Sequence, residues 1–472
     1  MTTPELAAKL AAVGQTSVLR FAQELDEPRQ ARLFGQLSAL DLDGLSNLVN
    51  KYVTGAYAPP IPNRFDPIAP MPRVPQTPQQ QELYEKARTR GQQLLREGKI
   101  GAFLVAGGQG TRLGYDGPKG EYPITPSCNK PLFQVFAEQL LAHGRLWGKC
   151  IPWYIMTSSV NDAATRAFFK HHNYFGHHAD NIFIFPQGMM PAFAMDGQLL
   201  LANKDSLALS PGGNGDCFRS LWRSGAVADM RRRGIVHLSY FNVDNPIVHC
   251  IDDLFLGLHD IAASDMSSKA IPKAGPAERV GNFAIADGKL QVIEYSDMPT
   301  DLASETNGDG SLKYASASIG IHAIRVDFVQ RLNDGGDLRL PWHRAVKAVP
   351  CLDAAGQPSA PAKCNAVKLE QFVFDAIPLA SNPLVYMTDR AEEFSPVKNA
   401  EGSDSPFTCQ RDQIRRSARW LEACGISVPR DENGDIQATI EISPLFAVTQ
   451  SHLLSRKSEI PAITRDAHIY LE

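Results

Sequence analysis

The sequence lacks the features that mark membrane-bound, exported and nucleic-acid-coating proteins. No stretch of its 472 residues approaches the ~20 uncharged apolar residues that a membrane-spanning helix needs. The N-terminus, Met1 to Lys9, lacks the charged and then apolar layout of a secretory signal. Basic and acidic residues nearly balance, with 47 Lys and Arg against 51 Asp and Glu, which gives a net charge of −4 at pH 7. We therefore expect neither a membrane nor a nucleic acid as partner.

Paired cysteines, repeats and coiled-coil heptads are also missing. None of the eight cysteines stands in a Cys-x-x-Cys pair, which argues against a zinc ribbon. Cysteines scattered along a chain without an export signal are typical of reduced, mostly buried thiols, so we expect a cytoplasmic protein. The absence of heptads leaves the oligomeric state open. A composition of 43% hydrophobic and 21% charged residues is ordinary for a folded globular protein of about three structural units.

The chain changes character twice along its length. The first ~55 residues carry a helical pattern, with a break between two helices at Asp26 and Pro28, and eight of the 33 prolines lie between Pro59 and Pro78. We expect that Pro-rich segment to be an extended surface tether. Beyond about Glu393 a helix (408–423) precedes a short tail with strand-like pieces. The predicted domains are residues 1–98, 99–392 and 393–472.

The middle of the chain alternates between buried strands and helices. Short apolar runs occupy 100–105, 153–156, 182–185 and 235–241, and helical segments such as 79–97 and 131–146 lie between them. This alternation predicts an α/β fold with a doubly wound, mostly parallel sheet. The N-terminal helices and a small C-terminal α+β domain are expected as additions to it.

A glycine-rich loop, Val105 to Gly120, directly follows the first buried strand. In an open α/β sheet, ligands bind beyond the carboxyl ends of the strands, so the loop is well placed. Its glycines allow close approach of a phosphate, and Arg112 and Lys119 add two cations.

Four interpretations of this loop differ in spacing and charge. A Walker loop is excluded because Gly-x-x-x-x-Gly-Lys-Ser/Thr is absent. A dinucleotide fingerprint fails because Gly114 comes one place late, and an NAD(P)-linked oxidoreductase has no need of the two cations. A tight strand-to-helix connection with chance cations stays possible. A nucleotidyltransferase signature, in which amides and cations hold a nucleoside triphosphate, explains all the features.

This loop resembles that of the UDP-sugar pyrophosphorylases, in particular the UDP-N-acetylhexosamine pyrophosphorylases. The resemblance extends over nearly the whole chain, because further motifs occur in the family's order. These are Ala12–Gln15, Trp153–Ser158, Gln187–Met189, Gly213–Gly215, Val243–Asn245, Ile293–Ser296, Lys368–Asp375 and Glu393–Ala400. The resemblance implies a Rossmann-like nucleotidyltransferase fold and an enzyme that forms a UDP-sugar and pyrophosphate from UTP and a sugar-1-phosphate.

The resemblance also implies roles for charged residues. Arg112 and Lys119 would hold the triphosphate, and Lys398 would contact the phosphate of the sugar. Asp244, which follows the apolar run 235–241, would hold Mg²⁺, a cation that prefers one or two carboxylates together with phosphate oxygens. From local sequence alone, Asp244 could equally cap a turn. An inactive binding protein is disfavoured because all four residues are present.

The remaining implied contacts are with uracil and the sugar. Nucleotide-binding residues are Ala106, Gly107, Gly108, Gly110, Gln187 and Gly215, with the Gln187 amide pairing with the uracil edge. Sugar-binding residues are Asn214, Gly281, Glu294, Ser318, Phe372 and Phe374. Glu294 could accept hydrogen bonds from two hydroxyls, whereas the two phenylalanines could equally be core residues.

Two positions depart from the acetylhexosamine pattern. Ser318 replaces an asparagine that helps to recognise the sugar, and Gly215-Asp216 is closer to the UDP-glucose pyrophosphorylases. We therefore expect UDP-N-acetylglucosamine as the product and keep UDP-glucose, or a broad range of UDP-sugars, as the alternative.

Two further clusters are expected to be surface features. The histidine pairs at 171–172 and 177–178 are predicted to lie in a solvated loop and not to bind a metal. Arg231 to Arg233 is predicted to be a helix C-terminus facing water.

Overall fold

The computed structural model describes residues 3–55, 65–335, 338 and 340–472. The chain divides into two compact units, each assembled from three chain segments. Unit 1 comprises Met1–Asn63, Gln187–Asp216 and Arg339–Asp375, and unit 2 comprises Arg64–Pro186, Cys217–Leu338 and Ala376–Glu472.

Unit 1 combines N-terminal helices with short strands from the later segments. Its helices are α1 (Thr3–Ala12), η1 (Thr16–Leu19), η2 (Ala22–Glu24), α2 (Glu27–Ser38), α3 (Leu42–Leu48), η3 (Val49–Val53) and η8 (Asn214–Asp216). Its strands are β5 (Met189–Pro191), β6 (Phe193–Ala194), β7 (Leu201–Asn203), β8 (Ser206–Leu207), β9 (Leu209–Pro211), β15 (His343–Lys347), β16 (Cys351–Leu352), β17 (Pro358–Ser359) and β18 (Ala366–Glu370). Strands β15, β18 and β6 form an antiparallel sheet, and the others pair as β5–β9, β7–β8 and β16–β17.

One apolar core joins the three segments of unit 1. Leu33 and Leu37 of α2 are fully buried and pack in the same cluster as Phe193 and Val367. The expected break before α2 is confirmed: Asp26 caps the helix by accepting a hydrogen bond from the Arg29 amide at 3.0 Å.

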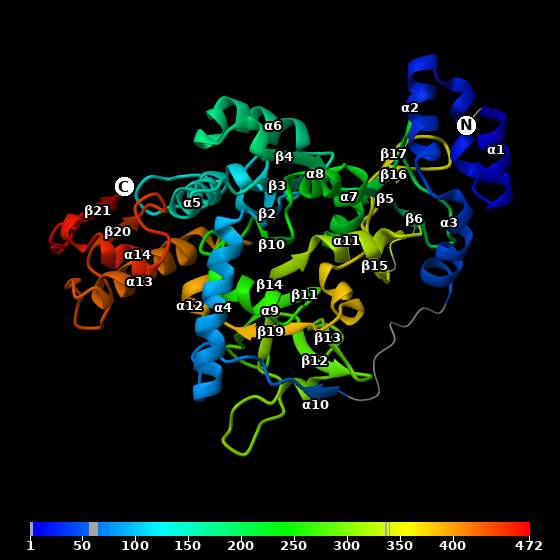
Figure 1. Ribbon diagram of the computed structural model, residues 1–472. Coiled ribbons are helices and arrows are strands. Elements are labelled where there is room, and N and C mark those ends of the chain that lie inside the picture. Colours follow the sequence, from blue (N-terminus) through cyan, green and yellow to red (C-terminus); the bar gives the residue numbers. More distant parts are fainter. Residues whose placement is uncertain (1–2, 56–64, 336–337, 339) are drawn as a thin grey trace. The chain divides into compact units, whose positions relative to one another are not determined.

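Unit 2 is built on a ten-stranded sheet within the described residues (Figure 1). Its strands are β1 (Phe65–Pro67), β2 (Ile100–Val105), β3 (Trp153–Thr157), β4 (Ile182–Pro186), β10 (His237–Asn242), β11 (Met266–Pro272), β12 (Asn282–Ala286), β13 (Lys289–Ile293), β14 (Ser316–Arg325) and β19 (Leu384–Met387). The main path runs β1-β12-β14-β10-β2-β3-β4. Strands β10, β2, β3 and β4 are parallel, while β14 is antiparallel to β10 and to β11, which pairs with β19 in parallel.

Unit 2 contains the helices α4 (Pro78–Arg96), η4 (Thr111–Leu113), η5 (Lys119–Glu121), α5 (Leu132–Trp147), α6 (Asp162–His171), η6 (Asn173–Gly176), η7 (Ala179–Asn181), α7 (Cys217–Arg223), α8 (Ala226–Arg233), α9 (Asp253–Ile261), α10 (Thr300–Ala303) and α11 (Val326–Asn333).

The two faces of the central strands pack against different helices. Leu104 and Ile155 share a cluster with residues of α4, α5 and α9. Tyr154 points the other way, and its hydroxyl donates to Asp229 of α8 at 2.8 Å. Successive strand residues thus serve opposite layers.

The C-terminal part of unit 2 has its own apolar cluster. It contains α12 (Arg390–Glu393), α13 (Pro406–Ala423), β20 (Thr439–Ile442), α14 (Gln450–Ser455), η10 (Lys457–Glu459) and β21 (His468–Leu471), while η9 (Val373–Leu379) spans the boundary at Asp375. Trp420 and Leu421 pack with Ile440 and Leu453. Glu441 accepts hydrogen bonds from the amides of Ser127 and Cys128, which attaches this part to the loop before α5.

The α/β class and a large sheet with a parallel centre are confirmed. Of the Pro-rich segment, residues 59–64 lie outside the described residues, and its described part includes β1, which pairs only with β12. Four of the eight cysteines are buried, whereas Cys128, Cys150 and Cys364 are exposed. Arg231 to Arg233 do form the exposed C-terminal turn of α8.

The expectation of a solvated loop is wrong for His177. Its side chain is buried, and Nε2 lies 2.9 Å from the carbonyl oxygen of Ala137 in α5. The ring also packs 6.1 Å from Trp153. A long-range contact with α5 therefore determines the position of His177, and the polar local sequence gives no sign of it.

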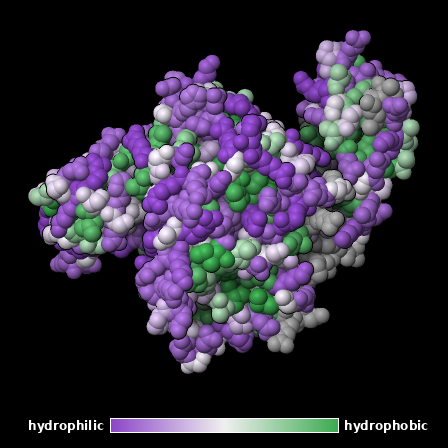
Figure 2. Space-filling model, in the orientation of Figure 1, coloured by the Kyte–Doolittle hydropathy of each residue, from purple (hydrophilic) through white to green (hydrophobic). Residues whose placement is uncertain are grey.

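The helices of the described residues contain no apolar stretch long enough to cross a membrane. Figure 2 shows that hydrophilic side chains cover most of the visible face and that hydrophobic residues form separate patches.

Burial of His322 predicts a loss of stability in acid. Burial lowers the pKa of His322 on β14 to about 3, whereas histidine in an unfolded chain has a pKa near ~6.5. Between these values the unfolded chain binds a proton that the folded chain does not, so stability falls as the pH falls. We expect His322→Gln to remove about 2 kcal/mol of the destabilisation between pH 7 and pH 5. Urea unfolding at both pH values measures it, and His178→Gln, at an exposed histidine, is the control. An unchanged pH dependence in His322→Gln would contradict the assignment.

Candidate functional site

The glycine-rich loop after β2 is closed by its own backbone. The Gly110 amide donates to the Gly117 carbonyl at 2.9 Å, and the Lys119 amide donates to the Gly108 carbonyl at 3.1 Å. These bonds bring the two ends of the loop together, so that Lys119 returns to the edge of the sheet from which the loop leaves.

Asn161 fixes the loop through hydrogen bonds to its backbone. The sequence analysis did not predict a role for this residue. Its amide nitrogen donates to the carbonyls of Ala106 at 3.0 Å and Gly108 at 3.2 Å. Its carbonyl oxygen accepts from the backbone and hydroxyl of Ser158 at 2.8 and 3.0 Å. Asn161 is fully buried at the start of α6. The sequence offered only one sign of this role, namely an asparagine placed between a buried strand and a helix.

The outer surface of the loop is open to an incoming group. A Cβ atom built on Gly108 would meet no atom within 4 Å, and Gly108 is exposed. Gly107 is half-buried, while Ala106 and Gly110 are buried. The loop therefore presents backbone without side chains at Gly108, as a bound nucleotide would require.

The predicted charged residues act on one another within unit 2. Burial lowers the pKa of the Lys119 ammonium, the charge of Asp244 opposes this shift, and the cations Arg112 and Lys398 add to it. Lys119 is thus within electrostatic range of all three, and Lys398 is brought there from a motif 279 residues downstream (398 − 119). Arg112 is exposed and Lys119 is half-buried.

Backbone hydrogen bonds connect Asp244 with the segment that carries Lys398. Asp244 follows β10, the strand beside β2, and its carbonyl accepts from the Val397 amide at 2.7 Å. The Lys398 ammonium lies 3.8 Å from Asp404, and 40% of the side chain is exposed. A charge pair at that distance is weak, so Lys398 can exchange Asp404 for an anionic ligand.

The described residues contain no group of three or more His, Cys, Asp or Glu arranged to hold a metal ion. Asp244 therefore stands as a single half-buried carboxylate beside cations. This donor set suits a hard cation that takes most of its ligands from phosphate oxygens.

A second group of predicted residues lies together in unit 2. The Ser318 amide donates to the Gly281 carbonyl at 2.8 Å, and a Cβ atom on Gly281 would lie 3.3 Å from a carboxylate oxygen of Glu294. Strand β14 connects this group with Asp244, because the Asn242 amide nitrogen donates to the Gly320 carbonyl at 3.4 Å. The predicted sugar residues of unit 2 therefore belong to the same sheet as β10, the strand that precedes the predicted metal residue.

A third group, built around Gln187, lies in unit 1. Gln187 is buried, and the amide of the next residue, Gly188, donates to Asp216 at 2.7 Å. The Asp216 side chain is itself buried and holds the turn that carries Gln187. The departure noted at Asp216 is thus a structural contact, which sequence reasoning did not recognise.

Asn214, Gly215 and the two phenylalanines also lie together in unit 1. The Val373 amide donates to the side-chain oxygen of Asn214 at 2.9 Å, which leaves its amide nitrogen as the group to offer a ligand. A Cβ atom on Gly215 would lie 2.7 Å from the backbone of Phe372, so glycine is required there by chain packing. The rings of Phe372 and Phe374 stack at 5.0 Å.

Comparisons with known proteins show the family to which the chain belongs. The sequence profile of the UTP–glucose-1-phosphate uridylyltransferase family matches residues 60–468. A UDP-N-acetylhexosamine pyrophosphorylase-like protein 1 from Mus musculus is 33% identical over 97% of this chain and 96% of its own length. The UDP-N-acetylglucosamine pyrophosphorylase of Saccharomyces cerevisiae is 38% identical over 72% and 73%.

A solved structure shows the same fold. The uridine diphosphate N-acetylglucosamine pyrophosphorylase of Trypanosoma brucei aligns with a TM-score of 0.80 at 23% identity, covering 100% of this chain and 98% of that one. The fold and the site thus define a nucleotidyltransferase. The chain belongs to the UTP–glucose-1-phosphate uridylyltransferase family.

The contacts of Asn161 predict that it supports triphosphate binding. Asn161→Ala removes the hydrogen bonds that fix Ala106 and Gly108, so the loop loses its set geometry. We expect the Kd for UTP to rise about 10-fold, the effect typical of removing a residue that orients a ligand-binding group. Isothermal titration calorimetry measures it. Asn333→Ala, which removes a buried asparagine between α7 and α11, is the control. Equal UTP affinity in both variants would exclude the role.

Proposed function

We propose that this protein transfers the uridylyl group of UTP to N-acetylglucosamine-1-phosphate, forming UDP-N-acetylglucosamine and pyrophosphate. The observation that carries the proposal is the convergence of Arg112, Lys398 and Asp244 on Lys119 at the carboxyl edge of β2 and β10. The Mus musculus and Saccharomyces cerevisiae relatives named above support the choice of product.

The reaction needs charge neutralisation more than covalent help. An oxygen of the sugar phosphate attacks the α-phosphorus of UTP, the bond to the β-phosphate oxygen breaks, and pyrophosphate leaves with its electron pair. Because both substrates are anions, cations that are already in place lower the barrier. Arg112 and Lys119 would hold the triphosphate, and Lys398 would hold the phosphate of the sugar.

Mg²⁺ fits the donor set as a proposed cofactor. Asp244 would hold it, together with phosphate oxygens of the substrates. Bound there, Mg²⁺ would neutralise charge on the phosphates. Burial and the nearby cations lower the pKa of the Lys119 ammonium below that of an ordinary lysine, and the charge of Asp244 opposes this shift.

Uracil recognition is assigned to the unit 1 group. The Gln187 amide offers one donor and one acceptor, which can pair with a carbonyl oxygen and the N3–H of uracil. Asp216 fixes the turn after Gln187 and thereby its direction. Since Asp216 contacts the Gly188 backbone, its presence does not favour glucose over N-acetylglucosamine.

In unit 2, we assign sugar contacts to Gly281, Glu294 and Ser318. In unit 1, the family resemblance gives a sugar role to Asn214, Phe372 and Phe374. An ionised Glu294 can accept from two sugar hydroxyls. The Asn214 amide nitrogen can donate to an acetamido carbonyl, and the stacked phenylalanines can pack on the acetamido methyl group. UDP-glucose synthesis is the less favoured alternative, kept because the side chain of Ser318, unlike that of asparagine, has no amide group.

We also propose a doubly wound, Rossmann-like sheet with a small C-terminal α+β domain. Helices on both faces of β2 and β3 support the first, and the separate cluster around Trp420 supports the second. The domain boundaries at 98/99 and 392/393 stay a prediction, as does a cytoplasmic location.

The activity is tested by pyrophosphate release from UTP and Mg²⁺ with a panel of sugar-1-phosphates. We expect the highest kcat/KM with N-acetylglucosamine-1-phosphate, no reaction with ATP, and loss of activity on chelation of Mg²⁺ that added Mg²⁺ restores. Absence of release with every hexose-1-phosphate would overturn the proposal. A preference for glucose-1-phosphate would establish the alternative.

Removing one charge from the phosphate site should slow the transfer strongly. We expect Lys398→Ala and Asp244→Asn each to lower kcat about 100-fold or more, since they would stabilise charge that develops in the transition state. Lys204→Ala is the control, because Lys204 is similarly exposed, at 35%, and pairs with Glu24 in unit 1. Steady-state kinetics measures all three. Rates for Lys398→Ala near that of Lys204→Ala would remove Lys398 from the mechanism.

A further inference from the structure

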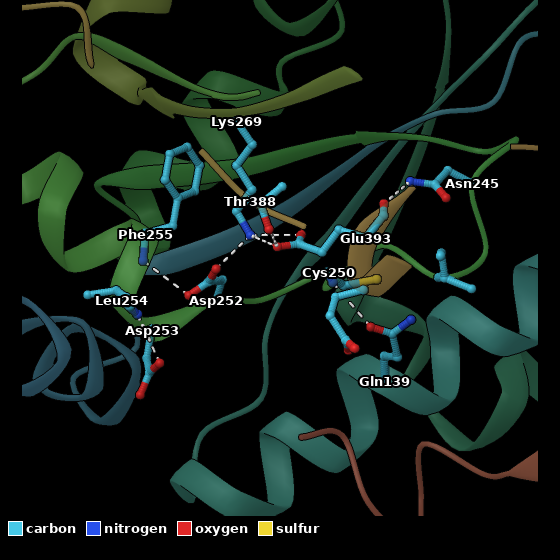
Figure 3. Close-up of polar contacts among 12 residues, drawn as sticks. Gln139, Asn245, Cys250, Asp252, Asp253, Leu254, Phe255, Lys269, Thr388 and Glu393 are labelled. Atoms are coloured by element: carbon cyan, nitrogen blue, oxygen red, sulfur yellow. Dashed lines mark hydrogen bonds and ion pairs between the residues drawn. The ribbon is translucent and has the colours of Figure 1, made fainter. Parts of the chain in front are cut away.

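A buried lysine in unit 2 is surrounded by carboxylates that the proposed reaction does not use. Lys269 on β11 is 1% exposed, and its ammonium lies 2.6 Å from Asp252 and 2.6 and 2.7 Å from the two carboxylate oxygens of Glu393. The Thr388 hydroxyl donates to Glu393 at 2.8 Å. Figure 3 shows the lysine pointing from its strand toward both carboxylates.

A lysine and two acidic residues are costly to bury together. Burial by itself lowers the pKa of Lys269, but Asp252 and Glu393 outweigh it and the pKa is raised. Burial raises the pKa of Asp252, but Lys269 outweighs it and lowers that pKa to about 2. Well-packed apolar residues often stabilise a fold as much as a buried ion pair does. The cluster therefore calls for an explanation other than stability.

Glu393 stands at the start of the segment that carries Lys398. Its carbonyl accepts from the Asn245 amide nitrogen at 2.6 Å, and the Ser395 amide donates to the Asn245 side-chain oxygen at 3.1 Å. Two residues further on, the Val397 amide donates to the Asp244 carbonyl. Residues 393, 395 and 397 are therefore each hydrogen-bonded to Asp244 or Asn245.

We call these three hydrogen bonds the 393–397 ladder. Asp244, the proposed Mg²⁺ ligand, lies on one side of the ladder, and Lys398 directly follows its last residue. The backbone of Glu393 makes the first hydrogen bond of the ladder, and its side chain pairs with Lys269 of β11. Figure 3 shows Asn245 reaching the Glu393 backbone from the side opposite to Lys269. A shift of Glu393 would therefore be passed along the ladder to Lys398 and Asp244.

We propose that Lys269 and Glu393 are positioning residues for uridylyl transfer: their ion pair sets the 393–397 ladder and thereby the places of Lys398 and Asp244. This inference rests on the proposed function. Neither residue touches a substrate, and both act through the ladder. Residues that orient ligand-binding groups from behind commonly change activity 10- to 100-fold.

A second buried ion pair in unit 2 supplies a matched control. The Lys130 ammonium lies 2.7 Å from Glu138, and the two side chains are 8% and 6% exposed. This pair connects the loop before α5 with Ser443 of the C-terminal part and makes no contact with the ladder among the described residues. Glu138→Gln therefore imposes a similar loss of a buried charge away from the phosphate site.

The first test compares Glu393→Gln with Glu138→Gln in pyrophosphate release. We expect Glu393→Gln to lower kcat about 10- to 100-fold and to raise the KM for the sugar-1-phosphate, with the KM for UTP changed less than about 3-fold. Glu138→Gln should stay within about 3-fold of the wild type in every parameter. Equal kinetics of the two variants would overturn the inference.

The second test asks whether Glu393 acts through Lys398. In a Lys398→Ala background, Glu393→Gln should lower kcat by clearly less than it does in the wild type, since one of the two groups that Glu393 positions is gone. A full, multiplicative loss in the double variant would show a general structural effect and overturn the inference.

Three outcomes separate this inference from other failures. If Glu393→Gln does not fold, Asn245→Ala carries the test, because it removes two rungs and leaves the ion pair intact; the same loss of kcat is expected, and wild-type kinetics would contradict the ladder. If the wild-type protein releases no pyrophosphate with any sugar-1-phosphate, the proposed function fails, and the inference falls with it. Normal wild-type activity with an unaffected Glu393→Gln overturns the inference alone.

Discussion

The parallel pairing of β2 with β10 is the constraint on which the phosphate site depends. Val105 is opposite Asn242, so the two strands end together, and the Val243 amide still donates to the Val105 carbonyl beyond the last pair. The loop with Lys119 and the turn with Asp244 therefore leave the same edge of the sheet. The register of one strand pair brings Lys119 and Asp244 within electrostatic range of each other, although they lie 125 residues apart in sequence (244 − 119).

The same edge explains how a chain with net charge −4 offers a site for anions. Arg112, Lys119 and Lys398 gather there, and the single carboxylate of Asp244 does not cancel them. Burying Lys119 among other cations is unfavourable, as its lowered pKa records. A bound polyphosphate would relieve that repulsion, and this relief would favour its binding. Average charge says little about such a site, because the compensating acids are spread over the remaining surface.

Sequence reasoning identified what is local and missed what is long-range. Apolar runs predicted β2, β3 and β4 within one residue, and the glycine loop was recognisable because spacing and charge lie in one contiguous segment. Asn161, Asp216 and the Lys269–Glu393 pair were missed, since each works through partners that only the fold brings close. Single polar residues in apolar surroundings have no periodicity, and strand β11 carries no clear apolar alternation. The grouping of Gly281, Glu294 and Ser318 likewise depends on the pairing of β12 with β13 and β14.

The division of unit 1 into three segments has a consequence for synthesis of the chain. Leu6 and Leu33 emerge from the ribosome first, but their core also contains Phe193, Val367 and Leu369. At roughly 5–20 residues per second, more than 300 further residues take about 15–60 s to appear. During that interval the apolar faces of α1 and α2 lack their final partners, while β2, β3 and β4 of unit 2 can already assemble. Helices α1 and α2 are thus synthesised well before part of the core that covers them, and until then their apolar faces are exposed to chaperones and proteases.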